Sequence, residues 1–259
     1  MVIIKNIIRN RILSTLGEFK NIANGIHILN SHYIGRNDLP KEVFHELLGK
    51  LNKRADFISI EGAVVAIKEK THQNQKLIAF TFDDGFEECY TKIAPVLSDF
   101  NTNAAFFINP GFIDGDDKYR KNFTENIVHV NKQPMTWKMI KELHQQGFII
   151  GNHTLDHVRL VGLNNEQLQH QISKAKNRIE EQLRSSCEYF AWTYGRNSDI
   201  DENALIYCLN HHKYVFGGDN YANYYSFNQR AINRRHIEGN WPFNHVKYFL
   251  SKTKSYGSV

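Results

Sequence analysis

The sequence predicts a single α/β domain built around a mainly parallel sheet. Short apolar segments alternate with amphipathic helical segments along the 259 residues, and repeated β-α units imply parallel strands, in an open sheet or a barrel. Residues 77–82 are apolar except for Thr81, as expected for a strand buried on both faces. A hydrophobic fraction of 41% is enough to supply one large core.

Seven segments are predicted to be strands because each is a short apolar run, most of them ended by turn residues. They are residues 25–33, 77–82, 104–108, 148–150, 189–192, 214–216 and 231–237. Gly85 follows the second segment, and the pair Gly217 and Gly218 follows the sixth.

Six predicted helices lie between these strands or after the last one. They are residues 40–51, 86–100, 137–146, 165–183, 202–211 and 242–251. Pro40 suits a first helical turn, Thr136 fits an N-cap, and Gly147 fits a helix end. Residues 57–67 fit either a strand or a helix, and residues 110–134 are expected to form a polar surface loop with some helix.

Residues 1–24 are predicted to form an amphipathic helix ahead of a domain at residues 25–259. Aliphatic residues share one face of this helix: Ile4, Ile7, Ile8, Ile12 and Leu16. Such a helix lies either on an anionic membrane surface or against the barrel, and we favour the second. Lys5, Arg9 and Arg11 interrupt the apolar run, so we expect neither a signal peptide nor a membrane-spanning segment.

Charge and cysteine content limit the kinds of ligand and the cellular compartment that we expect for this protein. The formal net charge is +5 and the basic residues are scattered, so nucleic acid is not an expected partner. The positive excess favours an anionic ligand such as a sugar nucleotide, a pyrophosphate-linked lipid or an acidic glycan. The three cysteines are widely spaced, which indicates reduced, mostly buried thiols in a cytoplasmic protein rather than a disulfide framework.

Two motifs place candidate metal ligands at the ends of predicted strands. Asp83-Asp84-Gly85 follows the second strand, and His153 and His157 follow the fourth. Alone, the first motif is usually a turn, and the second can be two exposed histidines on a helix. Because chemistry collects at the carboxyl edge of parallel strands, both together indicate one site. One carboxylate and two imidazoles suit a divalent transition metal, and the spare carboxylate suits a general base, which suggests a hydrolase.

These motifs and their surroundings resemble the NodB-homology polysaccharide deacetylases, carbohydrate esterase family 4. The resemblance rests on Thr-Phe-Asp-Asp-Gly at residues 81–85, on Ala-Ala-Phe-Phe at residues 104–107, and on residues 136–157 with Gly-Asn-His-Thr. It covers residues 25–237. It implies a distorted (β/α) barrel with about seven parallel strands and metal-dependent removal of N-acetyl groups from sugars.

Carried over residue by residue, the resemblance makes Asp83 the general base. It makes Asp84, His153 and His157 the ligands of one divalent transition metal, with Zn²⁺ favoured. Adjacent strand residues point to opposite sides, so Asp83 and Asp84 can share a site only if the strand has ended or bulged there. Gly85 makes that backbone geometry easy.

Residues 190–195 resemble the third motif of the family, with two departures. The better-known branch has arginine where Ala191 stands and proline where Thr193 stands, so another group must orient the base. The backbone N–H of Tyr194 is the predicted oxyanion donor. Trp192 is assigned to substrate binding.

The remaining roles fall at the ends of the first and last predicted strands. Arg234-Arg235-His236 resembles an ending found in one branch of the family. One arginine there is expected to orient the base, and Arg235 is assigned to substrate binding. His236 is a candidate general acid for the leaving amine, and His32 is a second candidate. A surface histidine fits the sequence about as well.

The predicted function is metal-dependent removal of an N-acetyl group from an amino sugar in a polysaccharide or its precursor. We expect a cytoplasmic enzyme, working in solution or at the inner membrane face on an N-acetylated sugar or glycan that carries an anionic group. An O-acetyl esterase or an N-deformylase would use the same residues. A non-catalytic glycan-binding relative ranks lower because Asp83 and the ligands are present, and a Mg²⁺ phosphatase ranks lower because Mg²⁺ prefers oxygen ligands.

Overall fold

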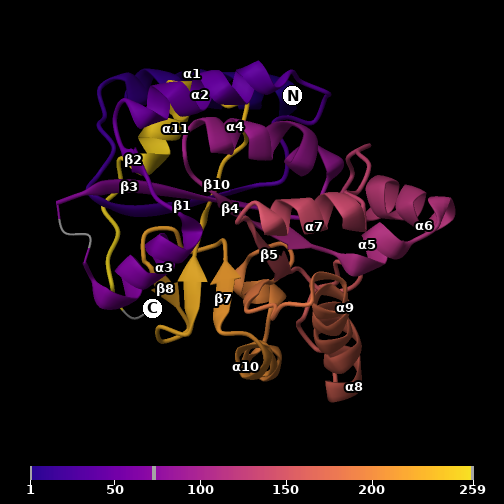
Figure 1. The fold of residues 1–259 in the computed structure, drawn as a ribbon. Coiled ribbons are helices and arrows are strands. Elements are labelled where there is room, and N and C mark those ends of the chain that lie inside the picture. Colours follow the sequence, from indigo (N-terminus) through magenta and orange to yellow (C-terminus); the bar gives the residue numbers. More distant parts are fainter. Residues whose placement is uncertain (1, 72–73, 258–259) are drawn as a thin grey trace.

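The computed structural model describes residues 2–71 and 74–257, with side chains from residue 9 onward, and its centre is a curled, mostly parallel sheet (Figure 1). Its strands are β1 (Gly25–Ser31), β2 (Asp56–Phe57), β3 (Lys76–Phe82), β4 (Ala104–Ile108), β5 (Ile149–Asn152), β6 (Tyr189–Ala191), β7 (Tyr214–Gly217), β8 (Tyr225–Ser226), β9 (Ala231–Asn233) and β10 (Arg235–His236). Their order is β10-β1-β3-β4-β5-β6-β7-β9-β8, and β2 pairs with β3. Only β8 and β9 pair antiparallel within the described residues. The predicted α/β fold and distorted barrel are confirmed.

All seven predicted strands are present, and the last one is divided where the barrel closes. β9 pairs with β7, and β10 pairs with β1 on the other edge. Arg234 lies between the two halves and is 1% exposed. Because successive strand residues point to opposite sides, Arg234 and Arg235 face different environments.

Helices cover the outside of the sheet. They are α1 (Val2–Glu18), α2 (Lys41–Asn52), α3 (Ile60–Glu69), α4 (Ala94–Asp99), α5 (Pro110–Asp114), α6 (Asp117–Asn122), α7 (Trp137–Gln145), α8 (Asn165–Leu168), α9 (Lys174–Leu183), α10 (Glu202–His211) and α11 (Phe243–Leu250). A π-helical turn joins α8 to α9, which together form the predicted helix at residues 165–183. The ambiguous segment at residues 57–67 contains the end of β2 and the start of α3, which begins where the Ser59 hydroxyl accepts a hydrogen bond from the Gly62 N–H.

The core lies on both faces of the sheet. Phe80 and Phe106 belong to the cluster under α2, α4 and α7, whereas Ala79 and Phe107 belong to the cluster packed against α3. This confirms that β3 is buried on both faces. The three cysteines are buried and unpaired, as predicted.

The insertion at residues 110–134 is more ordered and more buried than the predicted polar surface loop. It contains α5, α6 and a π-helical turn, and its Phe112 and Phe123 rings are buried and stacked with centroids 4.1 Å apart. These rings and Val130 form a small core of their own with Phe86. The apolar residues are spread among charged ones, so no helical stripe is visible in the sequence.

The N-terminal helix α1 packs on the domain, but the two described residues of its predicted apolar face point outward. It packs against α11. Ile12 and Leu16 are 53% and 45% exposed, whereas Gly17 lies against the Asn244 backbone. The side chains of Ile4, Ile7 and Ile8 lie outside the described residues. The face of α1 that carries Gly17 can approach the neighbouring helix closely because glycine has no side chain. Ile12 and Leu16 therefore point away from the domain.

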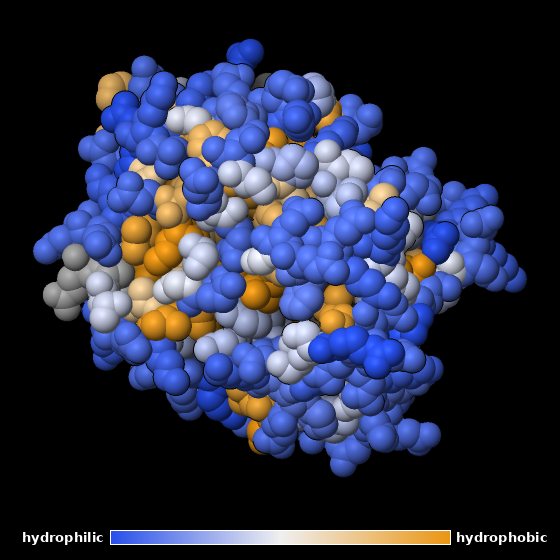
Figure 2. Space-filling model, in the orientation of Figure 1, coloured by the Kyte–Doolittle hydropathy of each residue, from blue (hydrophilic) through white to orange (hydrophobic). Residues whose placement is uncertain are grey.

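Polar residues dominate the face of the molecule seen in Figure 2. One face is covered largely by hydrophilic side chains, with small hydrophobic patches between them (Figure 2). Among the described residues, no helix is both long and apolar enough to cross a bilayer.

Candidate active site

Three candidate site residues have an unusual backbone conformation at the carboxyl edge of the sheet. Asp83 extends the pairing of β3 with β1, since its N–H donates to the Ser31 carbonyl oxygen at 2.9 Å. The chain then turns at Asp84, whose φ is +71°, and at Gly85. The strand has therefore ended where the sequence required it to end. His157 and Tyr194 also have positive φ, and such left-handed positions cluster at functional sites.

Asp84, His153 and His157 form one buried cluster. Asp84 Oδ1 lies 3.6 Å from His153 Nε2 and 3.3 Å from His157 Nε2. The His153 Nδ1 hydrogen bonds to the Ala191 carbonyl oxygen at 2.7 Å, which leaves its Nε2 facing Asp84. Asp84 Oδ1 has no hydrogen-bond partner among the described residues, although it is buried. A buried oxygen without a donor, beside two imidazole nitrogens, fits a metal cation.

The charges around this cluster favour the protonation states that metal ligands need. Burial alone would raise the pKa of the Asp84 carboxyl, but the neighbouring histidines, His157 foremost, together outweigh it and hold that pKa below its usual range. Burial lowers the pKa of His153 to about 4, with Asp83 opposing the shift. The carboxyl is thus ionised and this imidazole neutral near pH 7, as metal binding requires.

Asp83 is held by Arg234. The guanidinium donates from Nη1 to Asp83 Oδ1 at 2.7 Å and from Nη2 to Oδ2 at 2.9 Å. Both residues are buried. Burial alone would raise the pKa of the Asp83 carboxyl, but the Arg234 and His153 charges outweigh it and lower the pKa. The bidentate contact fixes both the charge and the orientation of this carboxylate.

A cavity of about 180 Å³ opens beside the cluster. Asp84, His157, His32 and Tyr194 line one part of it, and Ile127, Val128 and Val130 of the insertion line another. Tyr194 is 46% exposed, its ring centroid lies 4.8 Å from that of His157, and its backbone N–H donates to no acceptor in the described part of the chain. The insertion therefore forms an apolar wall of the site, which the sequence did not reveal.

The two candidate acids lie next to each other. The ring centroids of His32 and His236 are 5.5 Å apart, and His32 lines the cavity. His236 is partly exposed and its Nε2 lies 3.9 Å from Glu238 Oε1. The structure places His32 in the wall of the cavity and His236 directly behind it.

Two predicted substrate-binding residues do not face the cavity. Trp192 is fully buried, and its indole N–H donates to the Arg196 carbonyl oxygen, so no surface of the ring is open to a sugar. The Arg235 guanidinium stacks 3.7 Å from the Tyr221 ring centroid and 3.8 Å from that of Phe249. It therefore lies against these aromatic rings rather than near Asp83.

Other residues hold the site in place although they belong to no motif that the sequence analysis identified. The Asn109 amide donates to the carbonyl oxygens of His153 and Thr154, and the Asn152 side chain accepts from the Thr154 N–H. These bonds hold the turn between the two histidines. Because successive strand residues point to opposite sides, only one of Arg234 and Arg235 can face the barrel interior. The sequence pattern does not show which of the two does so.

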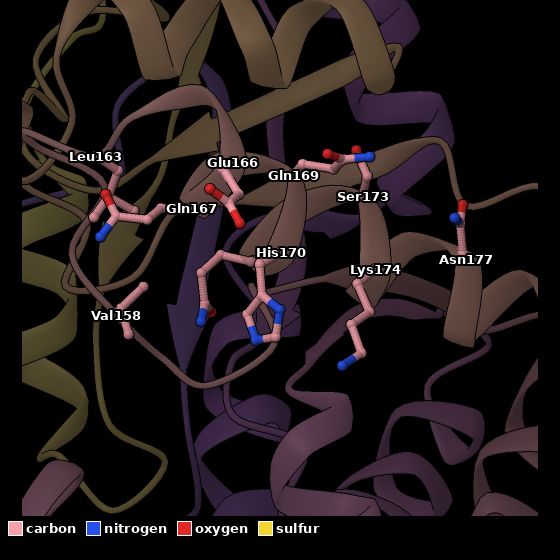
Figure 3. A pocket seen from close by; sticks show the side chains of 10 residues that line it. Val158, Leu163, Glu166, Gln167, Gln169, His170, Ser173, Lys174 and Asn177 are labelled. Carbon is pink, nitrogen blue, oxygen red and sulfur yellow. The ribbon is translucent and has the colours of Figure 1, made fainter.

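A larger groove, of about 650 Å³, lies beside the helix formed by α8 and α9. Figure 3 shows Val158 and Leu163 on one side and Gln167, His170 and Lys174 along the helix. None of its lining residues belongs to the metal-ligand cluster.

Sequence comparison gives the family. The profile described as polysaccharide deacetylase matches residues 70–208, which are 139 of the 259 residues and include Asp83, Asp84, His153 and His157. The chain belongs to the polysaccharide deacetylase family. The relatives described in the next paragraph are deacetylases, which are enzymes. This agrees with the prediction that the chain belongs to a family of hydrolytic deacetylases.

Individual polysaccharide deacetylases extend this result. A peptidoglycan-N-acetylglucosamine deacetylase of Bacillus cereus is 30% identical over 108 residues, which are 41% of this chain and 41% of that protein. IcaB from Ammonifex degensii matches with a TM-score of 0.69 at 19% identity, over 88% of this chain and 99% of that one. The Streptococcus pyogenes deacetylase PplD, solved with acetate, matches with a TM-score of 0.64 at 20% identity, over 85% and 96%. These structural matches establish the fold. The chain spans less than half the length of the curated relatives it matches.

Proposed function

We propose that this protein is a metal-dependent hydrolase that removes N-acetyl groups from an amino sugar of a glycan or its precursor. The observation that carries the proposal is the placement of a buried, arginine-bound carboxylate, Asp83, beside the Asp84, His153 and His157 cluster. Buried ionised side chains are costly unless they are paired or metal-bound, so this arrangement favours a chemical function.

Asp84, His153 and His157 would hold one divalent transition ion. Their donor atoms all lie within 4.8 Å of one another, and imidazole with carboxylate suits Zn²⁺ and related ions. Such an ion polarises an acyl oxygen and acidifies water. Zn²⁺ is our proposal for the ion because its preferred ligands match this set.

Asp83 would accept the proton of the attacking water. Its lowered pKa keeps the carboxylate ionised near pH 7, and Arg234 keeps it oriented. Tyr194 lines the cavity and its backbone N–H has no protein acceptor within the described chain, so this N–H would stabilise the oxyanion of the tetrahedral intermediate. Either His32 or His236 would protonate the departing amine, and acetate and a free amino sugar would leave.

The direct test is acetate release from an N-acetylated oligosaccharide. We expect the metal-loaded protein to release acetate, and a chelator to abolish the reaction. The matched control for the base is Asp99→Asn, which changes an exposed aspartate on α4, beside Asp83→Asn. Formate release from an N-formyl substrate, or acetate release from O-acetyl esters alone, would replace the proposal with a deformylase or an esterase.

We also propose a cytoplasmic, anionic substrate, on the basis of the net charge of +5. The test compares an N-acetylated nucleotide sugar, a lipid-pyrophosphate-linked glycan and a neutral chitin oligomer. Salt should weaken turnover of the first two if charge steers them to the site. Salt-insensitive turnover of the neutral oligomer alone, together with export of the chain, would contradict this proposal.

A further inference from the structure

Another pocket, of about 320 Å³, lies at the edge of the sheet opposite the metal-ligand cluster. Lys68 and Lys70 line it at the end of α3, which leads into the amino end of β3, and Lys213 lines it immediately before β7. Asp83 and Asp84 instead follow the carboxyl end of β3. The seven residues of β3, at about 3.3 Å each, separate the two edges by roughly 20 Å. The pocket is therefore separate from the candidate active site.

The charge of the pocket lining is positive. The lining contains four basic side chains and, among the residues that the structure describes there, no acidic one: Lys68, Lys70, Lys213 and Arg230. Arg230 makes a bidentate contact with Glu202, and Lys213 lies 3.5 Å from Glu188, so these two cations already have partners. Lys68 and Lys70 are exposed and form no ion pair with any described residue. Two ammonium groups without a carboxylate partner favour an anionic ligand.

The end of α3 explains why both lysines reach one pocket. Residues two apart on a helix point to different sides. Lys70 has a φ of +57°, so the chain leaves helical geometry there and turns its side chain away from the helical direction. The Lys70 Nζ lies 5.0 Å from the Tyr256 ring centroid, and the Tyr256 hydroxyl donates to the Ile67 carbonyl oxygen at 2.8 Å. This aromatic contact holds the ammonium group at the pocket without neutralising it.

Most of the remaining lining is aromatic or aliphatic. It consists of three tyrosines and three aliphatic residues: Tyr214, Tyr225, Tyr256, Val64, Val215 and Ile232. The three tyrosines are partly exposed, so parts of their rings are open to a ligand. The Tyr225 hydroxyl makes no hydrogen bond within the described chain, and Gln229 adds an exposed carboxamide that both donates and accepts. Tyrosine rings offer stacking surfaces for the flat face of a nucleic-acid base.

We propose that this pocket binds a mononucleotide, with its phosphate at Lys68 and Lys70 and its base against the tyrosine rings. A phosphate monoester carries a charge of about −1.5 to −2 near pH 7, which two lysines without a carboxylate partner match. The volume of about 320 Å³ lies at the lower end of the range for small-molecule sites, so it suits one nucleotide rather than two. The inference is independent of the proposed function because it uses no residue of the metal-ligand cluster.

The test is isothermal titration calorimetry of the full chain with AMP and UMP, and with uridine, glucose 1-phosphate and inorganic phosphate for comparison. We expect at least one nucleotide to bind about tenfold more tightly than any of the other three, because both the base and the phosphate make contacts. Lys68→Gln/Lys70→Gln should weaken nucleotide binding about tenfold, as expected for two lost, partly exposed charge contacts. The matched control is Lys53→Gln/Lys138→Gln, which removes the same charge from two exposed lysines outside the pocket and should leave the affinity unchanged.

A titration in the presence of a chelator shows whether the nucleotide binds at the metal-ligand cluster instead, since phosphate groups also coordinate metal ions. We expect equal affinity with and without the chelator in protein that circular dichroism shows to be folded. Binding that requires the metal, or binding that Lys68→Gln/Lys70→Gln weakens no more than the control variant does, would overturn the pocket assignment. Absence of binding by both AMP and UMP would do the same. Equal binding of glucose 1-phosphate or inorganic phosphate would overturn the assignment of the tyrosine rings to a base.

Discussion

Replacing Arg234 by methionine should damage both stability and activity, because the change leaves a buried carboxylate without its partner. Arg234 is 1% exposed, and its two hydrogen bonds to Asp83 are 2.7 and 2.9 Å long. Breaking such a buried pair from one side costs about 3–5 kcal/mol. In a domain of this size that corresponds to a fall in Tm on the order of 10 °C.

A natural control is available in Arg230, which makes a bidentate contact with Glu202 at 2.6 and 2.9 Å on the surface. Arg230→Met should change Tm far less, because exposed ion pairs contribute little. The Asp83→Asn/Arg234→Met double variant should be more stable than Arg234→Met alone, since the uncompensated charge is gone. Thermal and urea unfolding would be measured for the wild type, for the single variants Arg230→Met, Arg234→Met and Asp83→Asn, and for the double variant. Equal effects of Arg230→Met and Arg234→Met, or additive effects of Asp83→Asn and Arg234→Met in the double variant, would show that the buried pair does not stabilise the fold in this way.

Arg234→Met should also move the acid limb of the pH profile. Arg234 lowers the Asp83 pKa, and the base must be ionised, so its removal should shift the onset of kcat/KM to higher pH. Kinetics on folded protein below the lowered Tm would measure this shift. An acid limb at the wild-type pH would mean that Asp83 is not the titrating base.

Three further predictions follow from the site and the core. His153→Ala or His157→Ala should release a stoichiometric divalent ion, measured by elemental analysis against His45→Ala, and an ion retained by both would place the site elsewhere. Asp83→Asn should keep the metal and lower kcat about 10²–10⁴-fold, whereas Asp84→Asn should weaken metal binding; identical behaviour would contradict this division. Burial lowers the pKa of His27 to about 4 from 6.5, despite its bond to the Ala23 carbonyl oxygen and with Lys254 adding to the shift, so the stability this group provides is complete above pH 6.5 and lost as pH falls toward 4. His27→Asn should remove about 3 kcal/mol of that pH dependence in urea unfolding, and an unchanged dependence would exclude this group as its source.

Local pattern was enough to predict most of the sheet and the heart of the site. The strand at residues 77–82 is apolar on both faces, and its Asp-Asp-Gly ending predicted a chain turn, which the structure places at Asp84 with a φ of +71°. The four-residue spacing of His153 and His157 after another strand was enough to place them at the same edge. These features depend on neighbours in the sequence, so the sequence carries them.

The α/β fold, the order of the strands along the chain and the chemistry of Asp83, Asp84, His153 and His157 could thus be predicted from local pattern. Long-range packing sets which other side chains reach that chemistry. It chose Arg234 over Arg235 because the last strand changes partner between β7 and β1, and it buried Trp192. It also turned the insertion at residues 110–134 into a wall of the cavity. Such outcomes depend on contacts between segments that are distant in the chain, and periodicity within one segment contains no information about them.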